Sequence, residues 1–384
     1  MTQPRISVVL PAHCTEARHG TSRLRLTLIS LTRQTLDPGD YEVIVVDNAS
    51  EPPIASLVSG WGLADRVRVV RREETGLGAG YNAGLAEARA PLILLGTDDE
   101  LAAPEMLARH LEGHARAEPS VVFGHCTFLF HTELFHDVTI AEPAPKALDR
   151  AAARGETGWL PGAVACLGLA DKPVTADDVM HAWDKLMALA GTTPQFDDIE
   201  RTVASGRCHS LPGGWLAMRV GNHSLPVTVL REIGGFDETP DEHGGWYLDL
   251  ELGIRLADAG LRFGYAPAAV STNLTHPRGA GGMLGVVSGM AYVLSKHPRM
   301  DVTLSPSTSS ATWASPSTRV CCGPPSAGGL RPWRRGRPVP RPDLPYPYQG
   351  APPHARAQIC PVHRSVRADA HSPRRDLGTH RPHP

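Results

Sequence analysis

The amino-acid sequence predicts an α/β protein built on a doubly wound, mostly parallel β-sheet. Short apolar runs rich in β-branched residues recur along the first 125 residues, and two of them end at Pro11 and Asp47. Segments with helical spacing separate these runs. Strands that alternate with helices of about 10 to 15 residues are typical of a parallel sheet covered by helices.

The first 125 residues contain five expected strands. The run ISVVL at residues 6–10 ends at Pro11, and YEVIVV at residues 41–46 ends at Asp47. A glycine-rich turn at residues 75–80 opens an alanine-rich helix that ends near Arg89. Strands are expected at residues 6–10, 41–46, 66–70, 92–95 and 120–124, and further helices at about 23–34 and 104–115.

The pattern is less regular from residue 125 to residue 208 and then recovers. A helix is expected at residues 176–189, followed by a loop at 191–196. A helix at 246–259 should end at Gly260, because glycine is the usual residue after a helix C-terminus. Other expected elements are strands at 215–219, 262–267 and 269–272 and a helix at 226–232.

The last part of the chain, residues 301–384, differs sharply in composition. It carries a charge of about +8, against -10 for the first 300 residues, and 16 of the 35 prolines. Such a segment buries too little apolar surface to offset its ordering entropy, so we expect a disordered tail. A basic arm for nucleic acid is an alternative. We favour a late reading-frame shift as its origin, because the change is abrupt.

The composition also limits the class of protein. No secretory signal and no run of 18 or more apolar residues occurs, so no transmembrane segment is expected. The seven cysteines form no CxxC pair, which favours reduced thiols in a cytoplasmic protein over a disulfide framework or zinc site.

Three consecutive acids, Asp98, Asp99 and Glu100, follow the expected strand at residues 92–95. The carboxyl ends of strands in open α/β sheets are where ligands bind. Adjacent carboxylates repel each other, and Mg²⁺ or Mn²⁺ relieves that repulsion while bridging to phosphates. The alternative is an acidic helix start, with Asp99 as N-cap. We interpret Glu100 as a helix-start residue in either case.

The run GLGAGYNAG at residues 76–84 invites comparison with a dinucleotide-binding loop. That fingerprint follows the first strand of its unit, whereas this run follows the third expected strand with a different spacing. We therefore do not expect a dinucleotide cofactor. A glycine-rich turn that opens a helix still suits close approach of the backbone to a diphosphate or sugar.

Several motifs occur together in a fixed order: SVVLPAH, YEVIVVDNAS, GLGAGYNAGLAEA, LLGTDDE, GNHSL followed by IGGFDE, and YLDLELGIRLADAG. In this order they resemble the GT-A-fold, family-two inverting glycosyltransferases, over about residues 5 to 280. The resemblance implies transfer of a sugar from a nucleoside-diphosphate donor to an acceptor hydroxyl, with inversion and a divalent metal, Mg²⁺ or Mn²⁺.

The resemblance also implies a nucleotide-sugar site. Asp47 would accept the N3–H of a pyrimidine, although an Asx turn at DNAS is an equal alternative. Cys14 stands where the family has asparagine, and Tyr81 replaces an arginine. The residues implied to contact the donor are Pro11, His13, Glu16, Asp47, Gly76, Asn82 and Asp98.

Metal and catalytic residues follow from the same resemblance. Asp99 would bind the metal that bridges the two phosphates, and Asp98 would contact the donor ribose or sugar. His276 matches an occasional third metal ligand, and is otherwise a loop residue beside Pro277. Asp249 fits the position of the base that inverting transfer requires.

The acceptor side is less well marked. Leu248 replaces a glutamate of the family's Glu-Asp motif, and Glu251, two residues after Asp249, should face away from it. Asn222 and Trp215 lie where the family forms its acceptor pocket. Trp215 could equally be a core residue.

The expected function is a hexosyltransferase that uses UDP-glucose or a similar donor. Residues 1–125 would form the nucleotide-sugar-binding half of one domain, and residues 126–300 the acceptor-binding and catalytic half. The acceptor is expected to be small, such as an antibiotic or aminocyclitol natural product. The alternatives are a cell-wall or exopolysaccharide glycosyltransferase, a sugar nucleotidyltransferase and a non-catalytic sugar-nucleotide-binding protein.

Overall fold

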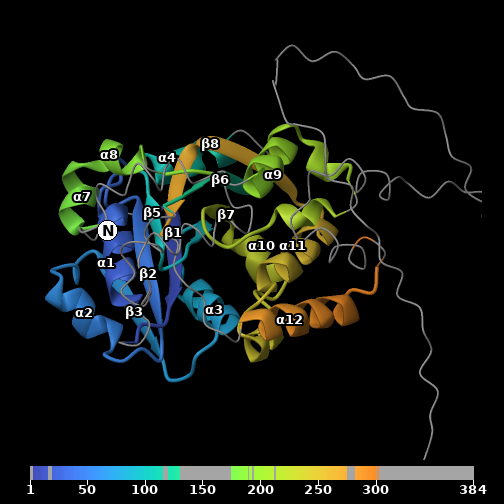
Figure 1. The fold of residues 1–384 in the computed structure, drawn as a ribbon, viewed down its shortest axis with the longest axis horizontal. Coiled ribbons are helices and arrows are strands. Elements are labelled where there is room, and N and C mark those ends of the chain that lie inside the picture. The colour runs from blue at the N-terminus through green and yellow to red at the C-terminus, as the bar shows by residue number, and fades with distance from the viewer. Residues whose placement is uncertain are drawn as a thin grey trace, which may run out of the picture. The chain divides into compact units, whose positions relative to one another are not determined.

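A computed structural model of the chain describes residues 3–15, 20–115, 120–129, 174–188, 190–192, 194–211, 213–274, 282–299 and 301. These residues form an eight-stranded sheet with strand order β3-β2-β1-β4-β7-β6-β8-β5 and helices on both faces (Figure 1). The expected α/β class with a largely parallel sheet is confirmed. The tail expected beyond residue 301 lies outside the described residues.

The N-terminal half of the sheet is parallel, as predicted, because its strands are linked by helices. β1 lies between β2 and β4, and β3 pairs with β2. The short helix α2 (Ile54–Gly60) was not predicted, since only seven residues separate its ends. The other elements are β1 (Ile6–Ala12), α1 (Gly20–Thr32), β2 (Tyr41–Asn48), β3 (Val67–Arg72), α3 (Leu77–Glu87) and β4 (Leu92–Leu95).

The second half of the sheet is mixed. β7 (His223–Pro226) is inserted antiparallel between β4 and β6 (Ser120–Phe128). β8 (Arg262–Asn273) is one strand where two were expected, and an irregularity in its pairing at Gly124 and His125 explains the interruption in its pattern. The edge strand β5 (Glu100–Ala102) pairs antiparallel with β8.

The strand expected at residues 215–219 is wrong. Residues Gly214–Ala217 form the 3₁₀ helix η5 instead. Gly213 adopts a left-handed φ of 79°, and a Cβ at Gly214 would lie 1.8 Å from the carbonyl oxygen of Cys208. The two glycines therefore allow a tight coil that the apolar run after them does not indicate.

Helices complete the described fold. The helix expected at 176–189 is split at Ala182 into α7 (Ala176–His181) and α8 (Trp183–Met187). The loop expected at 191–196 gives way to α9 (Pro194–Ala204), which buries Ile199 and Val203 one turn apart. The remaining helices are α4 (Met106–Ala115), η4 (Arg207–His209), α10 (Val227–Glu232), η6 (Thr239–His243), α11 (Leu248–Asp258) and α12 (Gly282–Lys296).

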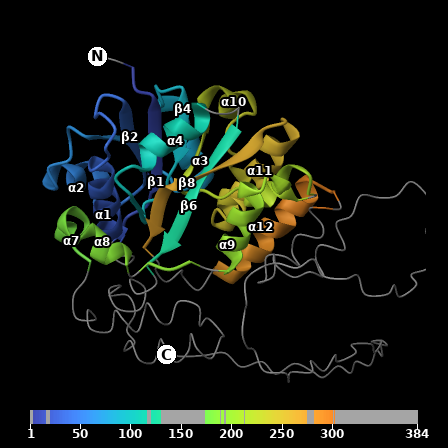
Figure 2. The ribbon, with the colours of Figure 1, turned by 90° about the horizontal axis from the view of Figure 1, so that it is seen from above.

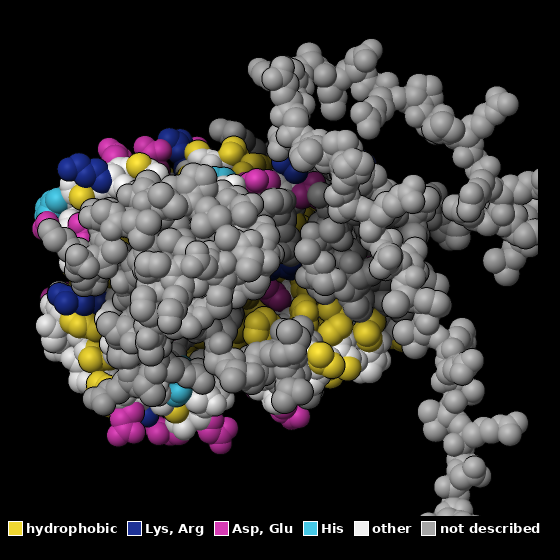
Figure 3. Space-filling view, viewed as in Figure 1, with side chains coloured by type: hydrophobic (Ala, Val, Ile, Leu, Met, Phe, Trp, Pro, Cys, Tyr) yellow, Lys and Arg dark blue, Asp and Glu magenta, His cyan; other side chains and the backbone are white. Residues whose placement is uncertain are grey.

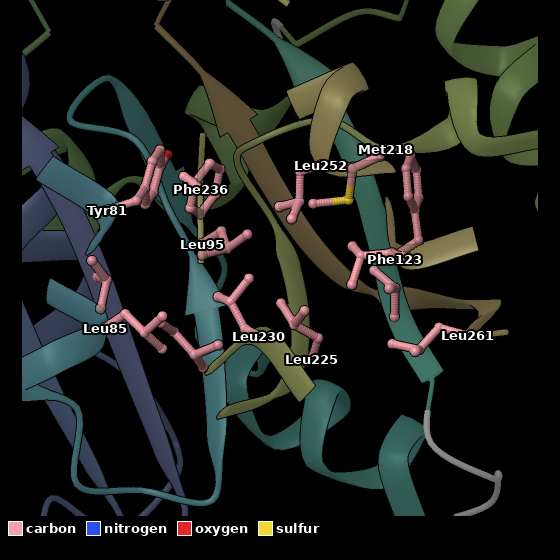
Figure 4. Packing of buried hydrophobic residues seen from close by; sticks show 14 of the residues in the cluster. Tyr81, Leu85, Leu95, Phe123, Met218, Leu225, Leu230, Phe236, Leu252 and Leu261 are labelled. Atoms are coloured by element: carbon pink, nitrogen blue, oxygen red, sulfur yellow. The ribbon is translucent and has the colours of Figure 1, made fainter. Parts of the chain in front are cut away.

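Two hydrophobic clusters cover the two faces of the sheet. One packs α1, α2 and α4 against one face, and the other packs α3, α9, α10 and α11 against the opposite face, an arrangement that Figure 2 shows from above. In the second cluster Tyr81 of α3 stacks on Phe236, with ring centroids 4.6 Å apart (Figure 4). This contact fixes the start of α3 against the loop after α10.

On the face in Figure 3, apolar side chains gather near α12, where Val287 is 62% exposed. Among the described residues, no helix is both long enough and apolar enough to cross a lipid bilayer.

A hydrogen-bonded chain through buried His110 and half-buried His114 joins α4 to β7. The Nε2–H of His114 and the hydroxyl of Ser224 are 2.8 Å apart, and that hydroxyl lies 2.8 Å from Nδ1 of His110. Nε2 of His110 is 2.7 Å from Oδ1 of Asn222, whose amide donates to the carbonyl oxygen of Ala269 (2.8 Å). Both nitrogens of His110 are paired in its neutral form, with Nε2 donating and Nδ1 accepting, so this network is suited to an uncharged imidazole.

Acidification is expected to destabilise the protein at a pH above the range in which ordinary carboxylates titrate. Burial lowers the pKa of His110 and His114 to about 4 and of His223 to about 3. An unfolded chain protonates these groups near pH 6.5, so it binds more protons than the folded chain between about pH 6.5 and 4. Glu100 offsets one of the three, because burial raises its pKa to about 7 and the folded chain takes up a proton there that the unfolded chain does not.

The free energy of unfolding should therefore fall by roughly 3 kcal/mol per pH unit below about pH 6. Urea unfolding monitored by circular dichroism at pH 8, 7, 6 and 5.5 measures this slope. A free energy that stays constant from pH 8 to 5.5 would show that these histidines are protonated in the fold.

Candidate active site

The acid loop, residues 96–99, lies at the carboxyl end of β4. Asp99 is only 6% exposed, and Asp98 is half-buried. The hydroxyl of Thr27 on α1 donates to the carbonyl oxygen of Asp98 (3.2 Å) and accepts from the N–H of Glu100 (3.1 Å). The carbonyl oxygen of Asp99 accepts from the N–H of Leu274, at 2.7 Å. The loop is thus held between α1 and the end of β8, with two carboxylates at the sheet edge.

Glu100 does not start a helix, so that prediction is wrong. It begins the edge strand β5 and turns its side chain into the protein, where it is 9% exposed. Its carboxyl group accepts from the hydroxyl of Ser271 (2.6 Å) and the thiol of Cys126 (3.4 Å). Burial raises the pKa of Glu100 to about 7, against the lowering effect of the Ser271 hydrogen bond.

The backbone next to Glu100 is shaped to admit this carboxyl group. Gly221 adopts a left-handed φ of 91°, and a Cβ there would lie 2.6 Å from Oε2 of Glu100. A small cavity beside the group, lined by Thr27, Gly96 and Asn222 among others, has room for about one water molecule. In the sequence, nothing distinguishes Glu100 from the two aspartates before it, so its burial was not predicted.

Asp249 lies in the first turn of α11 and is half-buried. The buried hydroxyl of Tyr81 interacts with both Asp249 and the acid loop. This hydroxyl donates to the carbonyl oxygen of Gly96 (2.7 Å). Burial raises its pKa first, and the negative charges of Glu100, Asp98, Asp249 and Asp99 raise it further. Carboxylates from the first half of the chain and Asp249 from the second half thus raise the pKa of the same hydroxyl group, which indicates that they lie in one region.

Glu251 faces away from Asp249, as expected from helical geometry. Its side chain is fully buried and forms ion pairs with Arg255 (2.7 Å), Lys296 (2.7 Å) and, when that ring is protonated, His297 (3.1 Å). Burial alone would raise the pKa of Glu251, but these partners hold it below its usual value. Glu251 therefore links α11 to α12, and we assign it a structural role.

Replacing Glu251 by glutamine is expected to destabilise the protein without altering the chemistry at Asp249. The change leaves buried cationic partners uncompensated, which costs about 3–5 kcal/mol and lowers the melting temperature by roughly 10 °C. Glu112→Gln is the matched control, because Glu112 pairs with Arg109 at the surface and its loss should cost at most about 1 kcal/mol. Calorimetry of both variants measures the difference, and equal melting temperatures would contradict the prediction.

The glycine-rich turn is occupied by a side chain that the sequence did not point to. Gly76 has a φ of 153° and precedes α3. The N–H groups of Gly78 and Ala79 donate to the two carboxylate oxygens of Asp241, at 2.8 and 3.0 Å. Asp241 is 163 residues from Gly78 along the chain, so no local pattern could indicate this cap. The N-terminus of α3 therefore already holds an anion from η6.

Asn82 on α3 holds the loop between α10 and η6, residues 236–238. Its amide donates to the carbonyl oxygen of Phe236 (2.9 Å) and to Glu238 (2.7 Å), and its carbonyl oxygen accepts from the N–H of Phe236 (2.7 Å). The side chain thus holds residues 236–238 in place. Its implied contact with the donor stays a prediction.

Asp47 is buried at the end of β2 with its carboxylate in use. Oδ1 accepts from the N–H of Ser50, and Oδ2 accepts from the N–H of Ile54 and from Arg71, at 2.8–2.9 Å. The bond to Ser50 is the local turn that the sequence offered as an alternative. Contact with a pyrimidine base stays a prediction.

Other implied nucleotide residues lie around the end of β1. Pro11 is buried within the strand, and Nδ1 of His13 donates to the carbonyl oxygen of Asn48 (2.7 Å). Burial raises the pKa of Cys14 to about 12, with Asp98 and Asp47 as further causes. Cys14 is therefore close to both acids. Glu16 lies outside the described residues.

The two implied acceptor residues have internal partners. Trp215 is 3% exposed, packs with Leu250 and Ile254, and donates its Nε1–H to Asp301 (2.8 Å). Asn222 is 1% exposed and joins His110 to β8. This arrangement agrees with the core alternative for Trp215, and contact of either residue with an acceptor stays a prediction.

The side chains that could bind a metal ion are the two carboxylates of the acid loop, Asp98 and Asp99. No group of three or more His, Cys, Asp or Glu side chains is arranged for a metal within the part of the chain that the structure describes. His276 lies outside it. Mg²⁺ commonly takes only one or two protein carboxylates and completes its shell with phosphate and water, so Asp98 and Asp99 fit such an ion.

Comparison with known proteins identifies the N-terminal part. Residues 7–141 match the model of the family described as Glycosyl transferase family 2. "Uncharacterized glycosyltransferase YfnE" of Bacillus subtilis (strain 168) is 28% identical over 298 residues, which cover 76% of this chain and 70% of that protein. The sequence resemblance to this family is confirmed.

Two further relatives carry a more specific description. Validoxylamine A glucosyltransferases from Streptomyces hygroscopicus subsp. limoneus and subsp. jinggangensis (strain 5008) are 29% and 28% identical over 265 residues, or 67% of this chain. The match spans about half the length of these relatives, 49% and 52% respectively.

Solved structures give more distant likenesses. The mannosyltransferase PcManGT from Pyrobaculum calidifontis, in complex with GDP-Man and Mn²⁺, is 15% identical with a TM-score of 0.43 and 83% of each chain covered. S. aureus TarS 1-349 is 13% identical with a TM-score of 0.46, covering 76% of this chain and 65% of that one.

Proposed function

We propose that this chain, a glycosyl transferase family 2 protein, moves a hexose from a nucleoside-diphosphate sugar to a hydroxyl group of a small acceptor. The donor is UDP-glucose or a similar UDP-hexose, and the acceptor is an antibiotic or aminocyclitol natural product. The described activity of the Streptomyces relatives supports this choice of donor sugar and acceptor class. Residues 1–125 bind the donor, and residues 126–300 bind the acceptor and supply the base.

The observation that supports the proposal best is that the charges of Asp98, Asp99 and Asp249 all raise the pKa of the buried hydroxyl of Tyr81, which donates to the carbonyl oxygen of Gly96 in the acid loop. Acids at a strand end suit a metal and a charged donor, whereas a single half-buried acid at a helix start suits proton transfer. Inverting transfer needs both groups in one site.

On the donor side, Asp99 holds a divalent ion, Mg²⁺ or Mn²⁺, and Asp98 contacts the ribose or sugar. His276 is the proposed third ligand. When bound, the ion supplies Lewis-acid stabilisation of the charge that develops on the leaving diphosphate. Thr27 and Leu274 fix the backbone of this loop, so the two carboxylates are oriented before the donor arrives.

On the acceptor side, Asp249 takes the proton of the attacking hydroxyl. The acceptor oxygen forms a bond to the anomeric carbon as the bond to the diphosphate breaks, which inverts that carbon. Asp249 suits this task because it is half-buried at the start of α11, whereas Glu251 is engaged by three cationic partners. Of the two acids in the first turn of α11, Asp249 is then the one available to the substrate.

Nucleotide release tests the proposal directly. The protein is incubated with Mg²⁺ or Mn²⁺, a panel of UDP-, GDP- and dTDP-hexoses, and validoxylamine A as an acceptor probe. Acceptor-dependent release of UDP from UDP-glucose is the expected result. Release of pyrophosphate from a sugar phosphate and a nucleoside triphosphate would indicate a nucleotidyltransferase. Binding of nucleotide sugars without turnover would indicate a non-catalytic protein, and either result would overturn the proposal.

A further inference from the structure

A polar cluster lies outside the residues assigned to donor binding and proton transfer. It consists of His125 on β6, Glu200 on α9 and Tyr265 on β8. Nδ1 of His125 donates to Oε2 of Glu200 (2.7 Å), and the hydroxyl of Tyr265 donates to the same oxygen (2.7 Å). Glu200 is nearly buried, with 8% of its side chain exposed. The cluster unites three elements from the half of the chain whose acceptor contacts are otherwise undefined.

The sheet places this cluster at the edge where the acid loop lies. Leu95, the last residue of β4, pairs with His223, and His223 pairs with Phe123. Since β4 and β6 both run antiparallel to β7, they run in the same direction. His125 is two residues beyond Phe123, and Asp98 is three residues beyond Leu95. Leu95 and Phe123 are thus level with each other across the sheet, and both His125 and Asp98 lie beyond them toward the carboxyl edge.

One residue connects the cluster to Glu100, which follows the acid loop directly. The thiol of Cys126 donates to Oε1 of Glu100 (3.4 Å), and its backbone N–H donates to Oε1 of Glu200 (3.0 Å). The two carboxylates thus bind the same residue from different sides. The position of α9 is thus fixed relative to the start of β5 through Cys126.

The side chain of His125 is partly exposed. Glu200 accepts the hydrogen on Nδ1, so in the neutral ring Nε2 carries the lone pair. The side chain is 28% exposed, and among the described residues no partner of Nε2 is found. Asp197, Glu200 and Tyr265 are the titratable groups that face this ring, and Glu200 raises its pKa.

An aromatic pair borders the cluster. Phe196 precedes Glu200 by four residues on α9, so the two side chains lie on the same face of the helix. Phe196 is half-buried and packs edge-on against Phe128, with centroids 4.8 Å apart. An accessible imidazole beside half-buried aromatic rings is the mixture of polar and apolar groups typical of a small-molecule site.

We propose that His125, oriented by Glu200 and Tyr265, binds a hydroxyl group of the acceptor through Nε2 and so defines part of the acceptor site. The inference rests on the proposed function, because it assigns the acceptor of that same reaction. The ligand class is a polyhydroxylated ring, either a sugar or a cyclitol. His125 is a binding residue here, and Glu200 is a positioning residue that acts through it.

Two substitutions of His125 separate binding from structure. In His125→Asn the amide nitrogen stands near the position of Nδ1, so the bond to Glu200 is kept and the outer contact is lost. In His125→Gln the amide stands near Nε2, so the outer contact is kept and the bond to Glu200 is lost. Both variants are assayed for UDP release from UDP-glucose without acceptor, and for transfer to validoxylamine A, D-glucose and N-acetylglucosamine as probes.

The expected result is a rise of about tenfold or more in the KM for the acceptor in His125→Asn, the effect of one lost hydrogen bond. Acceptor-independent release should be unchanged, and His125→Gln should lie closer to wild type in KM. Wild-type kinetics in His125→Asn with impaired His125→Gln would show a structural tether and overturn the inference while the proposed function stands. Absence of nucleotide release in the wild type would instead overturn the proposed function, and the inference with it.

Discussion

Replacing Asp99 by asparagine is expected to reduce metal-dependent release of nucleotide by about a thousandfold or more. Asp99 is 6% exposed at the end of β4, and asparagine has nearly the same shape, so the fold should survive. The substitution removes a negative charge that would hold the divalent ion at the diphosphate. An ion in that role contributes several kcal/mol to the transition state, and about 4 kcal/mol corresponds to a thousandfold.

Kinetics across a Mn²⁺ titration measure this effect. Asp65→Asn is the matched control, because Asp65 is exposed in the turn before β3 and its loss should leave turnover unchanged. Circular dichroism of both variants establishes that the fold is intact. Turnover within tenfold of wild type in Asp99→Asn would remove this residue from the metal site.

The features that the sequence predicted well are those set by local pattern. The buried strands β1, β2 and β4 are continuous apolar runs, and residues at their ends must lie along one sheet edge. That geometry places Asp98 and Asp47 near Cys14, whose pKa both raise. The start of α11 likewise follows from apolar spacing and from Gly260 at its end, so the location of Asp249 was predictable.

The features that the sequence missed depend on contacts between distant residues. Asp241 caps α3 from 163 residues away, and Asn82 holds Phe236 from 154 residues away. Neither pairing leaves a local signal, because capping residues are expected next to the helix they cap. Glu100 was assigned to a helix start for the same reason, whereas its partners Cys126 and Ser271 come from β6 and β8.

The acceptor half shows a second limit of local pattern. β7 is only four residues long and follows an apolar run that coils instead of extending. The close approach of Gly214 to Cys208 decides that conformation, and Cys208 lies in a region whose pattern was irregular. His125 and Glu200 become neighbours only because α9 packs on β8, so neither stood out as a site residue.

Replacing Asp249 by asparagine is expected to lower kcat by about a hundredfold to ten-thousandfold, the range that general bases contribute. The amide cannot accept a proton from the acceptor hydroxyl, while its size and its place in the first turn of α11 are unchanged. Asp249 touches neither the metal nor the nucleotide in the proposed arrangement. The KM for UDP-glucose should therefore stay within about threefold of wild type.

This separation of kcat from donor KM distinguishes Asp249 from Asp99. Asp99→Asn should weaken the dependence on Mn²⁺, whereas Asp249→Asn should keep that dependence and lose only the rate. Asp258→Asn is the control at the opposite end of the same helix, where the acid pairs with Arg299 at the surface. Unchanged kcat in Asp249→Asn, with normal loss in Asp99→Asn, would mean that another group takes the proton. The imidazole of His125 would then be the first alternative, because it is partly exposed and lies toward the same edge of the sheet.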